Sequence, residues 1–138
     1  MNIQSNKSID QLIKDIDNNK ILLPEFQRDF RWPVEKSETL FDSLFRNLFI
    51  GSLILSKPKF NLACKGFDLR PRGSKARKPK PTDKTLAEFE NNDIYTLLDG
   101  QQRVTSIYRA FKGIDLIHVE LKDMQEIEEL FDADNNFT

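Results

Sequence analysis

The residues best placed to do chemistry are Asp99 to Arg103, an unbroken polar and glycine run between an apolar stretch and an amphipathic one. Gly100 can adopt a positive φ and Asp99 is a good helix N-cap, so the chain can turn sharply into a helix here. The first N–H groups of that helix and the guanidinium of Arg103 would favour an anion, and phosphate is the natural guest. Gln101 and Gln102 would add neutral hydrogen-bond donors.

The same run also has a purely structural interpretation. An Asp-Gly pair before a helix is a common cap and turn, and an arginine in a first helical turn is often only solvated. The position of the run favours a site, because ligands of α/β proteins gather at the carboxyl ends of strands.

A second polar cluster alternates aromatic with charged residues between Glu25 and Trp32. In one interpretation Gln27 and Arg28 face a site that the aromatic side chains anchor. In the other, the aromatic side chains pack inward and the charged ones are merely solvated. The aromatic members are Phe26, Phe30 and Trp32.

One segment is strongly basic. Residues 65–84 hold eight basic and two acidic side chains, a local charge of +6, so the rest of the chain carries −7 within a net charge of −1. The range 57–92 has four prolines and little periodicity, and we expect an insertion or mobile loop there. Such a segment is either solvated or contacts phosphates of nucleic acid. The candidate contacts, with Arg31, are Arg70, Arg72, Lys75, Arg77, Lys78 and Lys80.

Composition narrows the class of protein. The chain has 138 residues, 38% of them apolar, which suits a single domain over residues 1–138. It shows no secretory signal and no apolar span, which favours the cytoplasm. One Cys and one His cannot build a zinc site or a redox pair.

The elements that must position these residues follow from hydrophobic periodicity. A helix is expected after the Ser8 cap, a strand at 21–23, a helix at about 33–48, a turn at Gly51 and a strand at 52–56. A strand at 94–98 then leads into a helix whose apolar face is Val104, Ile107, Tyr108 and Phe111. A strand at 114–121 and a helix at 124–131 complete an α+β fold, a small mixed sheet packed with helices. Neither a P-loop nor a GxGxxG motif occurs.

Three segments in order resemble a known family. They are residues 23–32 (LPEFQRDFRW), residues 49–52 (FIGS) and residues 98–106 (LDGQQRVTS). Together they resemble the N-terminal domain of GmrSD-type modification-dependent restriction enzymes and their relatives in phage defence, over about residues 9–119.

The resemblance implies a ParB/sulfiredoxin-like fold that binds and hydrolyses a nucleotide. Asp99 to Arg103 would be the phosphate-handling DGQQR motif, and Gln27 and Arg28 the FQR motif. The nucleotide (GTP or ATP) and any metal, such as Mg²⁺, stay open. In such enzymes a His-rich nuclease domain follows, which the single His118 cannot supply, so we expect the N-terminal part of a larger protein that does not cleave DNA alone.

Two hypotheses follow. In the first, the domain is an NTPase module in which Asp99 and Arg103 are catalytic, with Asp99 positioning a metal-bound or hydrolytic water unless it serves only as the cap. Nucleotide binding would use Gln27, Arg28, Gly100, Gln101, Gln102 and Arg103. In the second, the domain senses modified DNA without turnover, through the basic residues and an aromatic pocket.

Overall fold

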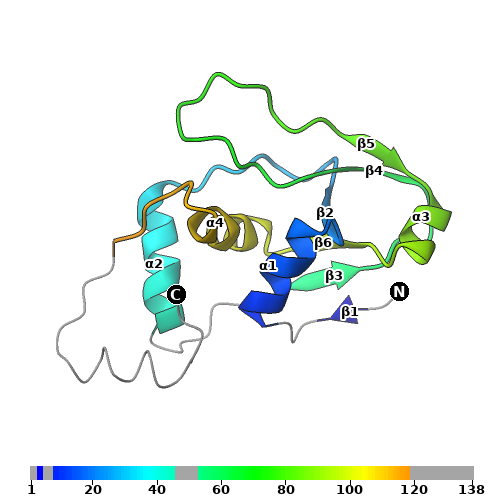
Figure 1. Cartoon of the computed structure of the whole chain (residues 1–138), viewed down its shortest axis with the longest axis horizontal. Helices are drawn as coiled ribbons and strands as arrows, with labels where there is room; N and C mark the ends of the chain where they lie inside the picture. Colours follow the sequence, from blue (N-terminus) through cyan, green and yellow to red (C-terminus); the bar gives the residue numbers. More distant parts are fainter. Residues whose placement is uncertain (1–2, 5–7, 46–52, 119–138) are drawn as a thin grey trace.

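The computed structural model describes residues 3–4, 8–45 and 53–118 (Figure 1). In these residues a six-stranded sheet has the order β1-β3-β6-β2-β4-β5. The strands are β1 (Ile3–Gln4), β2 (Ile21–Pro24), β3 (Ile54–Ser56), β4 (Leu62–Lys65), β5 (Thr82–Lys84) and β6 (Tyr95–Asp99). The helices are α1 (Ile9–Asp17), α2 (Val34–Phe45), α3 (Leu86–Asn91) and α4 (Gln101–Phe111). The predicted α+β class and mixed sheet are confirmed.

The centre of the sheet is a parallel pair, β2 and β6, in which Ile21 lies opposite Tyr95. The pairs on either side, β3 with β6 and β2 with β4, are antiparallel. Every residue of β2 is buried, as expected for an inner strand, and β2 ends at Pro24, which has no N–H for a further ladder bond. Because β2 and β6 are parallel, the segments that follow them leave the sheet at the same edge.

Successive side chains of β2 point to opposite faces of the sheet, and they divide the core into two layers. Ile21 and Leu23 belong to the main cluster, whereas Leu22 between them joins a second cluster with Phe89 of α3. In Figure 1 α3 lies at the opposite side of the picture from α2 and α4. The main cluster consists of Leu12, Ile16, Ile21, Leu23, Leu55, Phe67, Leu97, Val104 and Tyr108.

The helices begin where their sequences predict. Ser8 caps α1 by accepting a hydrogen bond from the Gln11 N–H at 3.2 Å, and α2 follows Pro33. Helix α4 buries Val104, Ile107 and Tyr108 of its predicted apolar face, but Phe111 is 48% exposed. Ile107 also packs with Leu40 and Phe41 of α2, where the hydroxyls of Ser37 and Ser106 are 2.6 Å apart.

Two predictions of local structure need correction. The range 57–92 is not a loop throughout, because it contains β4, β5 and the short α3, whose Thr85 and Glu88 form a capping box. Its mobility stays a prediction. The strand expected at 114–121 is absent from residues 114–118. The turn at Gly51, the end of the helix at 46–48 and the helix at 124–131 lie outside the described residues.

Candidate functional site

The turn between β6 and α4 is built on one glycine. Gly100 is the N-cap residue of α4 with φ of 90°, a left-handed conformation in which any side chain would be strained. A Cβ here would also clash with Leu53 and would lie 3.2 Å from Nη2 of Arg103, so the guanidinium lies beside the turn. No side chain caps the helix. Asp99 is exposed at the end of β6, and the prediction that it caps α4 is wrong.

The two polar clusters predicted from the sequence lie together at this turn. Nε2 of Gln101 donates to the carbonyl oxygen of Arg28, and Nε2 of Gln102 donates to that of Asp29 at 3.0 Å. Oε1 of Gln102 accepts from the Arg31 N–H at 2.9 Å. From the other side, Nε2 of Gln27 donates to the Leu98 carbonyl at 3.2 Å. The glutamine side chains therefore fix the backbone of residues 27–31 against the start of α4.

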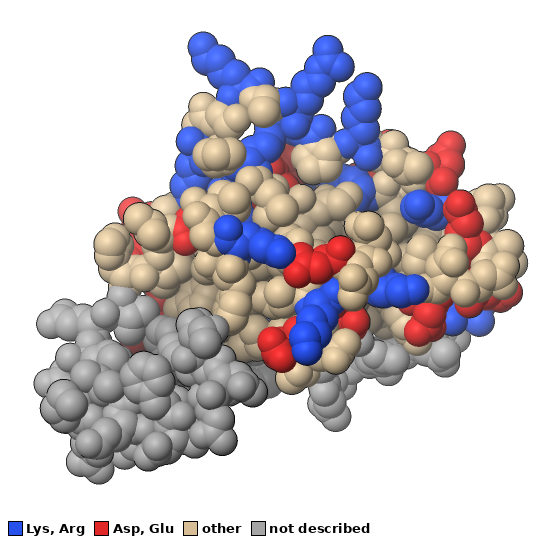
Figure 2. Space-filling model, in the orientation of Figure 1, with Lys and Arg blue, Asp and Glu red and all other residues tan. Residues whose placement is uncertain are grey.

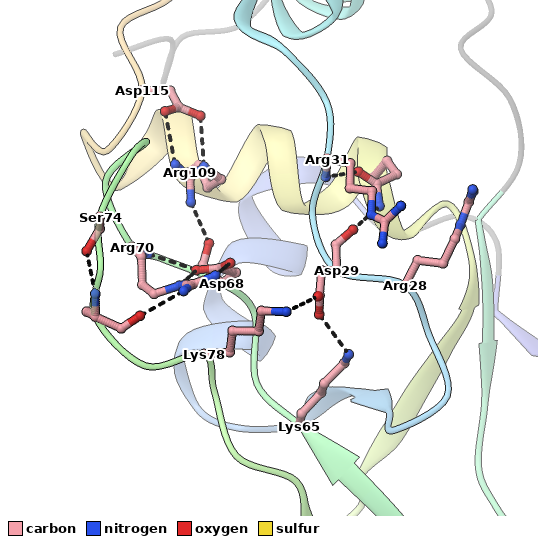
Figure 3. Close-up of polar contacts among 12 residues, drawn as sticks. Arg28, Asp29, Arg31, Lys65, Asp68, Arg70, Ser74, Lys78, Arg109 and Asp115 are labelled. Atoms are coloured by element: carbon pink, nitrogen blue, oxygen red, sulfur yellow. Dashed lines mark hydrogen bonds and ion pairs between the residues drawn. The ribbon is translucent and has the colours of Figure 1, made fainter.

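Asp29 connects this loop to the basic segment. Its carboxylate lies 2.7 Å from Nζ of Lys78 and 3.6 Å from Nζ of Lys65 (Figure 3). The hydrogen bond from Lys78 lowers the pKa of Asp29, aided by the charge of Lys65. Lys65 also donates to the Gln27 carbonyl at 2.8 Å. The two lysines thus fix one side of the loop, and the Asp29 carboxylate offsets one of their two charges.

Arg28 and Arg31 are exposed, and neither guanidinium has an ion-pair partner among the described residues. In Figure 3 the Arg28 side chain extends away from Asp29 and its two lysines. Gln101 fixes the backbone of Arg28 by a hydrogen bond to its carbonyl oxygen. The Arg28 guanidinium is exposed and stays available to a ligand.

Part of the basic segment is neutralised inside the domain. Arg70 forms a paired contact with Asp68, its Nη2 and Nε lying 2.8 and 2.9 Å from the two carboxylate oxygens. Arg72 reaches Asp115 at 3.2 Å, and Asp115 is bound more tightly by Arg109 of α4 at 2.8 Å. Arg109 also donates to the Asp68 carbonyl at 2.8 Å and so holds the start of the segment against α4 (Figure 3).

The rest of the basic segment faces solvent. Lys75, Arg77 and Lys80 are exposed and have no acidic partner among the described residues. Figure 2 shows Lys and Arg side chains gathered on one side of the molecule, where Figure 1 places the connection between β4 and β5. The predicted nucleic-acid contacts therefore divide into two groups. Arg70, Arg72 and Lys78 bind acidic groups of the domain, whereas no acidic partner is found among the described residues for Arg31, Lys75, Arg77 and Lys80.

The predicted aromatic pocket does not form. Phe26 is 71% exposed, while Trp32 packs with the α2 cluster. The Phe30 ring instead lies beneath two guanidinium groups, with its centroid 4.9 Å from Cζ of Arg109 and 5.4 Å from that of Arg72. His118 is exposed, and nothing in the structure suggests catalysis by it.

A cavity of about 430 Å³ adjoins the loop at residues 25–30. Gln101 and Thr105 of α4 line it on one side, and Lys65, Asp68 and residues 78–81 line it on another. The hydroxyl of Thr105 is buried and has no hydrogen-bond partner among the described residues. This cavity was not predicted from the sequence.

Several residues of this region were missed by sequence reasoning. Arg109 and Asp115 form a buried pair whose side chains are 3% and 2% exposed. One signal could have indicated Arg109: Gln101, Thr105 and Arg109 recur every four residues, so they share a helix face. The closeness of Asp115 to that face has no sequence signal, since it depends on the path of the chain after Gly113.

The described residues hold no group of three His, Cys, Asp or Glu side chains that could by itself hold a metal ion. They also contain no helix with the length and apolar character needed to cross a membrane. Fold and site together define a small α+β module built around a strand–turn–helix junction.

Comparison with known proteins gives the family. Residues 9–137 match the family described as GmrSD restriction endonuclease, N-terminal domain, and the chain belongs to this family. This is the family that the three sequence segments predicted. A relative is "Uncharacterized protein MJ0686" of Methanocaldococcus jannaschii, which is 30% identical over 110 residues. That match covers 75% of this chain but only 17% of the relative's length. No solved structure matches the chain.

Proposed function

We propose that this domain binds a nucleoside triphosphate at the junction of β6 and α4 and hydrolyses it. The observation that carries the proposal is the start of α4 at Gly100, which has no side-chain cap and lies beside the guanidinium of Arg103. The first N–H groups of a helix have no partner within the helix, and together with a guanidinium they favour a phosphate. The exposed guanidinium of Arg28 lies on the adjoining loop and adds a second positive charge.

Each residue has a role in this proposal. Gly100 lets the phosphates approach the backbone, and Arg103 neutralises the charge that develops as the terminal phosphate leaves. Asp99, exposed at the end of β6, positions the attacking water. Gln27, Gln101 and Gln102 act through the loop, because their amide nitrogens donate to backbone carbonyls and so hold Arg28 in place.

The proposal extends to the metal and to the whole protein. Mg²⁺ is usually held by one or two carboxylates and by substrate phosphates, so Asp99 fits as its protein ligand when a nucleotide is bound. Bound there, Mg²⁺ would neutralise phosphate charge. We also propose the ParB/sulfiredoxin-like fold, and a nuclease domain or subunit outside this chain that cleaves modified phage DNA.

Replacement of Arg103 tests the phosphate site. We expect Arg103→Ala to weaken GTP or ATP binding by about 10- to 100-fold, the value of one or two charge-assisted hydrogen bonds, with little change in melting temperature. Arg103→Lys should also bind more weakly, because lysine lacks the bidentate fork. Titration followed by a phosphate-release assay separates binding from hydrolysis.

Arg77→Ala is the matched control, since Arg77 is exposed on the basic segment and should leave nucleotide affinity unchanged. Equal affinities of the wild type and Arg103→Ala would exclude the site. Tight binding without phosphate release would exclude only the hydrolysis.

A second candidate function is contact with DNA, favoured by the exposed Lys75, Arg77 and Lys80 (Figure 2). Such contacts release counterions, so affinity falls with salt at a slope of about −0.9 per phosphate neutralised. The Lys75→Gln/Arg77→Gln variant should lower that slope on duplex DNA. Lys14→Gln/Lys59→Gln removes the same charge at exposed positions elsewhere and should not. Equal slopes for the two double variants would exclude this surface.

A further inference from the structure

Helix α4 has a second buried face, and it is polar. Gln101, Thr105 and Arg109 follow one another at intervals of four residues and are only 8%, 1% and 2% exposed. A buried polar group is costly unless it is hydrogen-bonded, so each member of such a stripe needs a partner.

The first and last members of the stripe have partners. Gln101 donates to the Arg28 carbonyl, and Arg109 binds Asp115 and the Asp68 carbonyl, the latter at 2.8 Å. Thr105, between them, is the exception: its hydroxyl bonds to nothing in the described part of the chain. It is the residue of the stripe for which the fold supplies no partner.

A cavity adjoins this stripe. Thr105 and Gln101 line it together with apolar side chains, namely Leu23, Phe30, Pro79 and Pro81. Its volume of about 430 Å³ falls within the range of small-molecule sites, about 300–1,000 Å³. These apolar side chains offer a surface for a flat ring, while most of the other lining residues are charged or polar and could bind its polar groups.

The charges around the cavity favour a ligand whose ring is neutral and whose other end is anionic. Lys65 and Lys78 both contact Asp29, whose single carboxylate offsets one of their two charges, and the lining residue Asp68 is paired with Arg70. Arg28 and Lys80 also line the cavity, and both are exposed without an ion-pair partner among the described residues. Glu25 adds one opposing charge at the wall. The interior is therefore nearly neutral, while two cations remain for an anionic group.

We propose that this cavity receives the base of the bound nucleotide and that the hydroxyl of Thr105 hydrogen-bonds to the edge of that base. The inference rests on the proposed nucleotide binding and divides the site between two faces of α4. Gly100 and Arg103 do not line the cavity, so they meet the phosphates, and the Gln101–Thr105 face meets the base. Arg28 lines the cavity and adjoins the turn, so it lies between the two parts.

Thr105→Val tests the assignment. Valine keeps the size and shape of threonine but removes a hydroxyl that the protein itself does not satisfy, so the melting temperature should stay equal or rise. We expect GTP or ATP to bind about 5- to 30-fold more weakly, the effect of one lost hydrogen bond to a ligand. The affinity for inorganic triphosphate, which has no base, should not change.

Ser106→Ala is the matched control on the neighbouring residue. Its hydroxyl bonds to Ser37 at 2.6 Å in the contact with α2, not in the cavity. This variant should lose stability and keep its nucleotide affinity, the opposite of Thr105→Val.

The outcomes separate this inference from the function on which it rests. A wild-type protein that binds neither nucleotides nor triphosphate overturns the proposed function. Nucleotide binding that Thr105→Val leaves unchanged, or a loss that extends equally to triphosphate, overturns the base assignment alone. An effect of Thr105→Val seen only with short single-stranded DNA also overturns it, because the base would then belong to a strand.

Discussion

The two ends of helix α4 hold their surroundings by different chemistry. At the start of the helix, Gln101 and Gln102 use neutral amides to fix the backbone of residues 27–31. Near its end, Arg109 and Arg72 share the carboxylate of Asp115. The side chains that α4 itself supplies are neutral amides at the first end and a charged guanidinium, bound in an ion cluster, at the second.

The difference shows how charge can be reserved for a ligand. Near the end of α4, Arg109 and Arg72 are both bound to the carboxylate of Asp115, so these two guanidinium groups are engaged within the fold. Neutral amides at the start of α4 shape the loop but do not neutralise Arg28, whose guanidinium has no ion-pair partner among the described residues. An anion would therefore bind at the start of α4, and the contrast can be tested by breaking each end in turn.

The largest effect is expected from Asp115→Ala. It leaves Arg109, whose side chain is only 3% exposed, without its main partner, and loss of one member of a buried pair costs about 3–5 kcal/mol. Urea denaturation measures the free energy of unfolding. Lys14→Ala is the control, because the side chains of Lys14 and its partner Asp10 are 65% and 76% exposed, and such pairs contribute at most about 1 kcal/mol. Equal losses in both variants would refute the structural role of the cluster.

A smaller loss is expected from Gln102→Ala. It removes two hydrogen bonds to the backbone of residues 29–31, which should cost about 1–2 kcal/mol of stability. If the loop positions Arg28 for phosphate, this variant should also weaken nucleotide binding without removing a charge. Gln11→Ala removes an exposed helical bond to Asp15 and should change neither quantity appreciably. Unaltered nucleotide affinity in Gln102→Ala would separate the loop from the site.

The smallest expected effect is on how the free energy of unfolding changes as the pH falls. Burial alone would raise the pKa of Asp115, but the hydrogen bonds and charges of Arg109 and Arg72 outweigh burial and lower it. A carboxyl with a lowered folded pKa stabilises the fold at neutral pH, and this stabilisation is lost as pH falls through that pKa. The free energy of unfolding should thus decline below about pH 4, more steeply in the wild type than in Asp115→Asn. The amides at the start of α4 do not titrate in this range. Parallel pH profiles for the two proteins would contradict the assignment.

Sequence reasoning succeeded where the signal is local. The strand, glycine turn and helix around Gly100 follow from apolar periodicity and from the freedom of glycine at positive φ. The family resemblance implied that Gln27 and Arg28 share a site with this turn, and the structure brings residues 27–31 and the turn together. The family followed from the order of three short segments.

Sequence reasoning failed where a side chain binds a partner that is far away in the sequence. The glutamines were expected to face a ligand, and nothing in the sequence shows that their amide nitrogens would donate to backbone carbonyls 71–73 residues away. The basic run gave no sign that Arg72 would bind the carboxylate of Asp115, which is 43 residues further along the chain. Thr105 resembles any helical threonine until the cavity beside it is known.

The span between the two motifs also bears on when the site can form during synthesis. Hydrogen bonds between residues 27–31 and 98–102 cross 71–73 residues of chain, and the parallel partner of β2 is β6. At about 5–20 residues per second, the ribosome needs several seconds to release the second motif after the first. Until then the first motif lacks its amide partners, and closing so long a loop makes this a slow, late contact. Ligand binding would consequently report on a fully folded domain, and a nascent chain that ends before α4 should have no affinity for the ligand.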